Sequence, residues 1–197
     1  MSLTIEHLTN LQSKLQNDSN DYQIELREGN LIVMGPSDIV SSYIGAQLSR
    51  LLGNWVTPRR LGLVFDSSGG FILPNADLTA PDVSYVSRSR MPRTVRYFSE
   101  VVPDLVVEIK SQSEKPFGHS FAYRITKLQE KLQMFLGQGV KVGILIDPDE
   151  LTVTLYRHHQ TPIVFTDNET LTLPELLPGW ELQISDLWPP VFEENGD

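Results

Sequence analysis

The sequence predicts a mixed α/β domain around one central sheet. Two observations indicate this fold class: helix-like and strand-like segments follow one another along the chain, and a long amphipathic helix connects two strongly apolar strand segments. A length of 197 residues fits a single domain with a sizeable core. We therefore expect residues 1–197 to form one domain, with a polar tail from about residue 189.

The first third of the chain predicts a helix, a hairpin and a second helix. Residues 3–16 carry leucines at helical spacing. Residues 22–26 and 31–35 are strand-like and enclose a turn with glycine and asparagine, which is typical of a β-hairpin. Residues 38–55 again place apolar side chains at helical intervals, and Asp38 or Ser37 could cap the start of this helix.

The rest of the chain reads as strands around one clear helix. Residues 67–70, Ser-Ser-Gly-Gly, separate two short strand-like pieces and predict a second hairpin. One face of residues 120–136 is apolar, which predicts the long helix. The strand-like segments in this part are 60–66, 70–74, 79–87, 101–111, 140–148, 151–157, 161–167 and 181–185.

Composition excludes several classes of protein. The absence of cysteine rules out disulfides, thiolate catalysis and cysteine-bound zinc. No apolar run is long enough to span a bilayer, and the first residues do not resemble a secretory signal, so we expect a cytoplasmic protein without a membrane partner. The net charge of -9 opposes avid nonspecific binding to nucleic acid. Local basic patches at Arg59-Arg60 or at Arg88, Arg90, Arg93 and Arg96 could still contact phosphates, or these arginines could simply be solvated.

Three residues suggest chemistry on phosphate esters. Asp82 precedes one strand, and Glu108 and Lys110 lie near the end of another. Side chains alternate along a strand, so Val106, Glu108 and Lys110 should share one face. Two carboxylates can bind Mg²⁺, with Mn²⁺ as a substitute, while an amine orients water or stabilises the negative charge of a phosphoryl transition state.

Each of these residues also has an ordinary structural interpretation. A Pro-Asp pair before a strand is common turn chemistry, and Glu108 with Lys110 could be a simple ion pair on a strand. The interpretation as a site depends on the combination of Asp82 with the later pair.

In this combination the chain resembles the PD-(D/E)XK nucleases, and more closely the Uma-type family of restriction-endonuclease-like proteins. The resemblance runs in order through IELREGNLIVMGPS, APDVSYVS, VPDLVVEIKSQS, KLQMFLGQGVKVGILIDPDELTVTLYR and LPGWELQISDLW. It implies a restriction-endonuclease-like core, a central mixed sheet flanked by helices, with an extra N-terminal hairpin and extra C-terminal strands.

The resemblance also implies site residues. It assigns Asp82 and Glu108 as metal ligands, and it matches Glu25 to an early glutamate that could be a third ligand or position a water. In the family the residue two positions after the glutamate is commonly not lysine, and a lysine on the following helix is thought to substitute for it. Lys131 matches this helix position. Because this chain has both Lys110 and Lys131, the sequence leaves open which lysine acts.

Three functions follow from this site. The first is a magnesium-dependent endonuclease that acts on DNA. A homodimer would let two sites meet two strands, although no sequence feature requires dimerisation. The second is a weakly active or inactive nuclease-fold module that binds nucleic acid or a protein. The third is an enzyme on another phosphorylated substrate, which the same carboxylates and lysine could serve.

Overall fold

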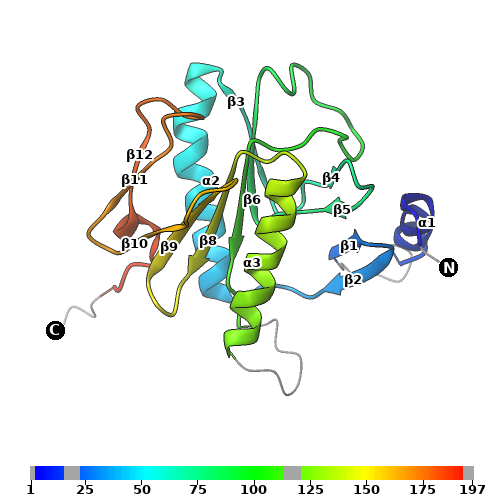
Figure 1. The fold of residues 1–197 in the computed structure, drawn as a ribbon, viewed down its shortest axis with the longest axis horizontal. Helices are drawn as coiled ribbons and strands as arrows, with labels where there is room; N and C mark the ends of the chain where they lie inside the picture. The colour runs from blue at the N-terminus through cyan, green and yellow to red at the C-terminus, as the bar shows by residue number, and fades with distance from the viewer. Residues whose placement is uncertain (1–2, 16–22, 113–120, 193–197) are drawn as a thin grey trace.

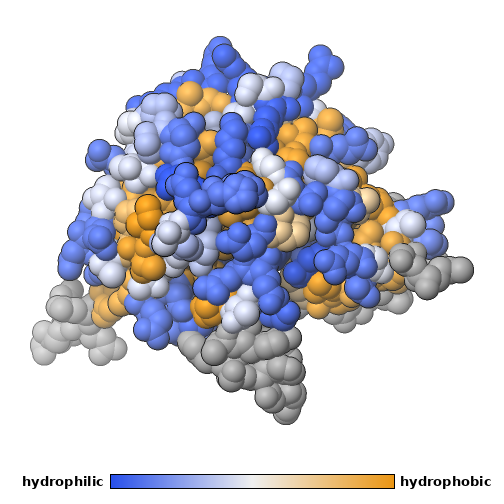
Figure 2. All heavy atoms as spheres, viewed as in Figure 1, coloured by the Kyte–Doolittle hydropathy of each residue, from blue (hydrophilic) through white to orange (hydrophobic). Residues whose placement is uncertain are grey.

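The computed structural model describes residues 3–15, 23–112 and 121–192. It confirms the mixed α/β class: a six-stranded mixed sheet lies between the two long helices, with smaller sheets on either side (Figure 1). In the described part of the chain, no helix has both the length and the apolar character needed to cross a bilayer. On the face seen in Figure 2, hydrophilic side chains predominate and apolar ones form small separate groups.

The six-stranded sheet has the order β10-β9-β8-β7-β6-β3. Only β7 and β8 are parallel, and α3 connects them as a crossover helix. The strands are β3 (Gly62–Asp66), β6 (Val83–Ser87), β7 (Leu105–Ile109), β8 (Val142–Asp147), β9 (Thr152–Arg157) and β10 (Ile163–Phe165).

Two smaller sheets complete the fold. The first has the order β2-β1-β5-β4 and contains the predicted N-terminal hairpin; α1 (Ile5–Leu15) packs against its β1 strand. The second pairs two short C-terminal strands, of which β11 was not predicted. The strands are β1 (Gln23–Arg27), β2 (Asn30–Met34), β4 (Phe71–Ile72), β5 (Leu78–Thr79), β11 (Thr170–Thr172) and β12 (Glu181–Gln183). A 3-10 turn, η2 (Ile184–Leu187), follows β12.

Helix α2 (Ile39–Arg59) covers one face of the six-stranded sheet. Its N-cap is Asp38, whose side chain accepts a hydrogen bond from the backbone N–H of Ser41 at 3.0 Å. Buried apolar residues recur every fourth position, at Ile44, Leu48, Leu52 and Val56. The helix continues four residues beyond the predicted end and stops at Arg60, which takes a left-handed conformation with φ 54°.

Helix α3 (Phe121–Gly137) covers the opposite face. Alternation along β7 separates two cores: Leu105, Val107 and Ile109 pack on the α2 side, whereas Val106 packs below α3 with Leu132. Glu108 has the same parity as Val106, so the strand directs it toward α3.

The hairpin predicted around residues 67–70 is wrong. The backbone turns there, with the N–H of Gly69 bonded to the carbonyl of Asp66 at 3.1 Å, but β3 and β4 do not pair. Instead β3 pairs with β6, and β4 pairs with β5 in the other sheet. Turn residues indicate only that the chain reverses. The partner residues of β3 lie 17 positions (Asp66 to Val83) to 25 positions (Gly62 to Ser87) farther along the chain.

Candidate active site

Asp82 and Glu108 lie at the same end of two neighbouring strands. The antiparallel pairing of β6 with β7 places Val83 opposite Val107, and one further step in this register places Asp82 opposite Glu108. The two carboxyl groups are close enough for the charge of Asp82 to raise the pKa of Glu108, in addition to the effect of burial. Asp82 Oδ2 accepts a hydrogen bond from the N–H of Ile109 at 2.7 Å, which ties the aspartate to the end of β7.

Lys131 brings a buried amine to this pair of carboxylates. On α3 it follows Leu128 by three residues and precedes Phe135 by four, so it borders the apolar stripe and faces the sheet. Its Nζ lies 2.9 Å from Glu108 and 3.2 Å from Glu25. Only 8% of Lys131 is exposed, so the charge must be matched by these carboxylates.

Glu25 joins the cluster from the smaller sheet. It is fully buried on β1, between residues that pack under α1. Its Oε1 accepts the N–H of Ala80 at 2.9 Å, and its Oε2 lies 2.9 Å from the Nε of Arg27. Glu25 therefore has charged or polar partners on both oxygens, and its part as a third metal ligand stays a prediction.

Burial and charge separate the pKa values of the acidic groups. Burial raises the pKa of Glu108 to about 8, and the nearby Asp82 and Glu25 add to the rise while Lys131 opposes it. Burial also raises the pKa of Asp82, against Lys131 and the Ile109 N–H. For Glu25, burial is outweighed by Lys131, Arg27 and the Ala80 N–H, and its pKa is lowered.

The acidic cluster in turn stabilises the charged amine. Burial acts to lower the pKa of Lys131, but Glu108, Glu25 and Asp82 together raise it above its ordinary value. Lys131 therefore keeps its proton at neutral pH. In this state it can donate hydrogen bonds or offset negative charge, and it cannot accept a proton from water.

The amine of Lys110 pairs with carboxylates other than Asp82 and Glu108. Its Nζ pairs with Asp147 Oδ1 at 2.7 Å and with Asp149 Oδ2 at 3.1 Å, whereas Glu108 pairs with Lys131. The parallel register places Ile109 opposite Ile146, and one further step places Lys110 opposite Asp147, so these two side chains pair across the strands. The β7-α3-β8 order makes these strands parallel neighbours, and this signal in the sequence could have placed Asp147 beside Lys110.

The structure also distinguishes the two Pro-Asp pairs. Asp104 precedes β7 and so lies at the opposite end of that strand from Glu108. It is fully buried, and it pairs with Lys141 Nζ at 2.8 Å and Arg90 Nε at 3.2 Å. Arg90 also donates to the carbonyl of Val102 at 2.8 Å. Asp104 and Arg90 therefore stabilise the fold, and Arg90 does not belong to a basic surface patch.

A cavity that the sequence did not reveal leads to Asp82. It has a volume of about 500 Å³ and is lined by the start of α2, the end of β3 and the residues after β2. Its walls are mostly small: among them are Gly35, Ser42, Gly45 and Ser49. Small walls leave the Asp82 carboxylate accessible to an extended polar ligand.

The donor set fits a cation held by two carboxylates. Across the residues described, no three histidine, aspartate or glutamate side chains form a group that could hold a metal ion. Mg²⁺ is commonly bound by one or two carboxylates, with waters and substrate phosphates as its other ligands. Asp82 and Glu108 would supply such a pair. Lys131 Nζ lies 2.9 Å from both carboxylate oxygens of Glu108, so a cation held by Glu108 would share this carboxylate with the amine.

Comparisons with known proteins identify the family of the chain. A family model described as "Uma2: Putative restriction endonuclease" matches residues 6–185. A crystal structure from Anabaena variabilis ATCC 29413, described as "a putative nuclease belonging to DUF820", superposes with a TM-score of 0.73. That protein is 26% identical, and the match covers 90% of this chain and 96% of the other. The comparison with curated proteins gave no match. Because the family match includes the strands and the helix that carry Glu25, Asp82, Glu108 and Lys131, the chain belongs to the Uma2 family of restriction-endonuclease-like proteins.

Proposed function

We propose that this protein is a magnesium-dependent endonuclease that hydrolyses phosphodiester bonds in DNA. The observation that supports the proposal is the meeting of Asp82, Glu108 and the amine of Lys131 beside an accessible cavity. Carboxylate oxygens from two strands and a buried cation are the groups that phosphodiester hydrolysis requires. When bound, Mg²⁺ would act as a Lewis acid on the phosphate and make a bound water more acidic.

Each residue has a distinct part in the proposed reaction. Asp82, which lines the cavity, holds one side of the cation site, and Glu108 holds the other. Lys131 keeps its proton and offsets the negative charge that develops on the phosphoryl oxygens. Glu25 fixes the position of Lys131 through its 3.2 Å contact. Lys110 holds the ends of β7 and β8 together through Asp147.

Plasmid cleavage tests these parts. We expect wild type to nick supercoiled DNA with Mg²⁺ or Mn²⁺, and Asp82→Asn and Glu108→Gln to lose roughly 100-fold or more, since metal ligation contributes several kcal/mol. Asp186→Asn, a change of the same kind at an exposed position, is the matched control and should cleave like wild type. Equal cleavage by the two site variants and the control would refute the assignment.

A pair of lysine variants distinguishes the two amines. Lys131→Met should abolish cleavage, whereas Lys110→Met should keep it in the fraction of protein that folds. Loss of cleavage in folded Lys110→Met, with activity retained in Lys131→Met, would assign the chemical role to Lys110 instead.

One observation favours a second function, a nuclease-fold module without catalysis. Lys131 already contacts both Glu108 and Glu25, so the amine occupies the carboxylate that a cation would need. Titration with Mg²⁺ by calorimetry separates the two functions. An endonuclease should bind the ion and lose the signal in Asp82→Asn, whereas a non-catalytic module should give no signal in either protein.

A further inference from the structure

A second cavity, lined by aromatic side chains, lies beside the one that leads to Asp82. Its volume is about 630 Å³, within the range of roughly 300–1,000 Å³ that small-ligand sites occupy. The two cavities share one turn: Asp66 and Ser67 line the Asp82 cavity, and the next residues, 68–70, line the aromatic cavity. A ligand strand that passes over this turn would reach both.

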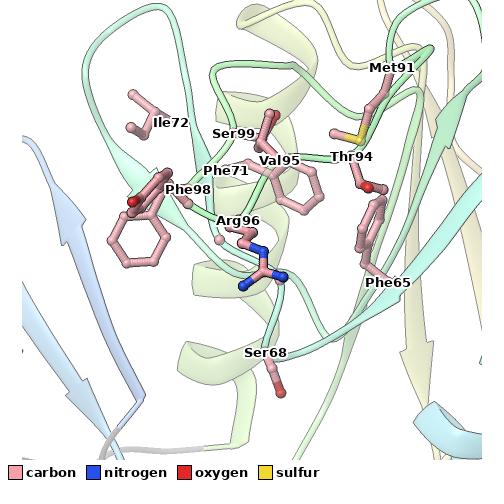
Figure 3. A pocket seen from close by; sticks show the side chains of 13 residues that line it. Phe65, Ser68, Phe71, Ile72, Met91, Thr94, Val95, Arg96, Phe98 and Ser99 are labelled. Carbon is pink, nitrogen blue, oxygen red and sulfur yellow. The ribbon is translucent and has the colours of Figure 1, made fainter.

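The aromatic cavity has a buried floor and an exposed rim. Phe71 and Met91 form the floor, with exposed fractions of 2% and 7%. Phe65 meets Phe71 edge to face, with ring centroids 5.6 Å apart. Residues 94–97 form the exposed rim. Figure 3 shows Arg96 between Phe98 and Phe65 in this view, with its guanidinium directed toward the turn.

The charge around this cavity is opposite to that of the whole protein. The chain has a net charge of -9, yet among the residues that the structure describes no aspartate or glutamate lines the aromatic cavity. Arg96 lines it, and in the described chain this arginine has no ion-pair partner within 4.0 Å. An adjoining cavity, which shares Met91 and Thr94 with the first, is lined by Arg60, Arg88 and Arg93. A local basic surface next to an apolar hollow is complementary to a ligand with phosphates and a flat apolar group.

We propose that the aromatic cavity receives one unpaired nucleobase of the DNA strand whose phosphodiester lies at Asp82 and Glu108. The base stacks on Phe98, and Arg96 contacts a neighbouring phosphate. This inference rests on the proposed nuclease function, which supplies the strand. It adds a preference for single-stranded or locally unpaired DNA, because a paired base must first leave its stack.

The test uses a short single-stranded oligonucleotide that contains 2-aminopurine, in EDTA so that cleavage cannot occur. Wild type should bind it and change its fluorescence as the base stacks. Phe98→Leu, which removes the ring but keeps an apolar side chain, should weaken binding roughly tenfold or more. Val95→Trp, at an exposed rim position, fills the cavity without altering the core and should have the same effect.

Charge is tested separately by the salt dependence of binding. Arg96→Ala should make the slope of log K against log salt shallower by about 0.7, the value for one phosphate contact with a single strand. Arg50→Ala removes an exposed arginine from α2 outside both cavities and should leave the slope unchanged. Urea midpoints equal to that of wild type would show that each variant is folded.

The outcomes separate this inference from the proposed function. If plasmid cleavage depends on Asp82 but Val95→Trp and Arg96→Ala bind and cleave like wild type, the cavity is not a base site and the endonuclease proposal stands. If wild type cleaves nothing yet binds the probe through Phe98 and Arg96, the base site stands and the endonuclease proposal fails. Absence of probe binding by wild type, or binding without a fluorescence change, overturns the inference.

Discussion

Replacement of Glu108 by glutamine should stabilise the protein at high pH while it abolishes cleavage. Burial raises the pKa of Glu108 to about 8, so the folded protein holds a proton there that the unfolded chain releases near 4.5. Ionisation of Glu108 therefore lowers the stability of the folded state. This loss is absent below pH 4.5, grows as the pH rises, and is complete above about pH 8. The amide cannot ionise and therefore avoids this cost.

The magnitude follows from the same values. Each pKa unit corresponds to about 1.4 kcal/mol, so a rise from 4.5 to about 8 sets an upper limit of about 5 kcal/mol. The amide loses the charge that pairs with Lys131, and Glu25 remains as its partner. We expect the free energy of unfolding of Glu108→Gln to exceed that of wild type by roughly 1–3 kcal/mol at pH 8.5. The gain from removal of the buried charge is reduced, but not cancelled, by the loss of the ion pair.

Urea denaturation of both proteins at pH 8.5 and pH 5 measures this difference. The advantage of Glu108→Gln should be largest at pH 8.5 and shrink at pH 5, where the wild-type carboxyl is protonated in the folded state. Glu25→Gln is a matched control with the opposite sign: the pKa of Glu25 is lowered, so its carboxylate stabilises the fold at neutral pH and the amide should lose stability there. Destabilisation of Glu108→Gln at pH 8.5, or a difference independent of pH, would refute the reasoning.

Three further predictions concern the fold around the site. Asp38→Ala should cost about 1–2 kcal/mol through loss of the α2 cap. Burial opposes ionisation of Asp38, but hydrogen bonds from Ser41 and from residues 111 and 112 lower its pKa to about 2. The ionised Asp38 therefore stabilises the fold fully above pH 3.8, and this stabilisation is lost as the pH falls through 2. Acid titrations of wild type and Asp38→Ala would show the difference. Lys110→Met should lower the free energy of unfolding, measured in urea, by roughly 2–4 kcal/mol, because Asp147 is left without its cation. A loss within about 0.5 kcal/mol, the range of ordinary surface changes, would contradict the structural role. Leu132→Ala, at a fully buried position in α3, should cost about 2–5 kcal/mol by thermal or urea unfolding, and a neutral effect would mean that α3 is not packed as described.

Local pattern predicted most of the elements and half of the site. Apolar spacing placed α2, α3 and the strand of Glu108, because burial against a neighbouring layer requires that spacing. Parity along that strand correctly grouped Val106 with Glu108 below α3. It did not show that Lys110 pairs with Asp147, because the partner of a side chain depends on the register between neighbouring strands.

The sequence by itself determined most of the helices and strands, and which carboxylates accompany a strand end, because these follow from covalent geometry and side-chain period. Only the tertiary structure decided that β3 joins β6 rather than β4, that Lys131 meets Glu25 and Glu108, and that two cavities share the turn after β3. Glu25 and Lys131 are 106 positions apart along the chain. Such contacts depend on how whole layers pack, which no local pattern of residues specifies.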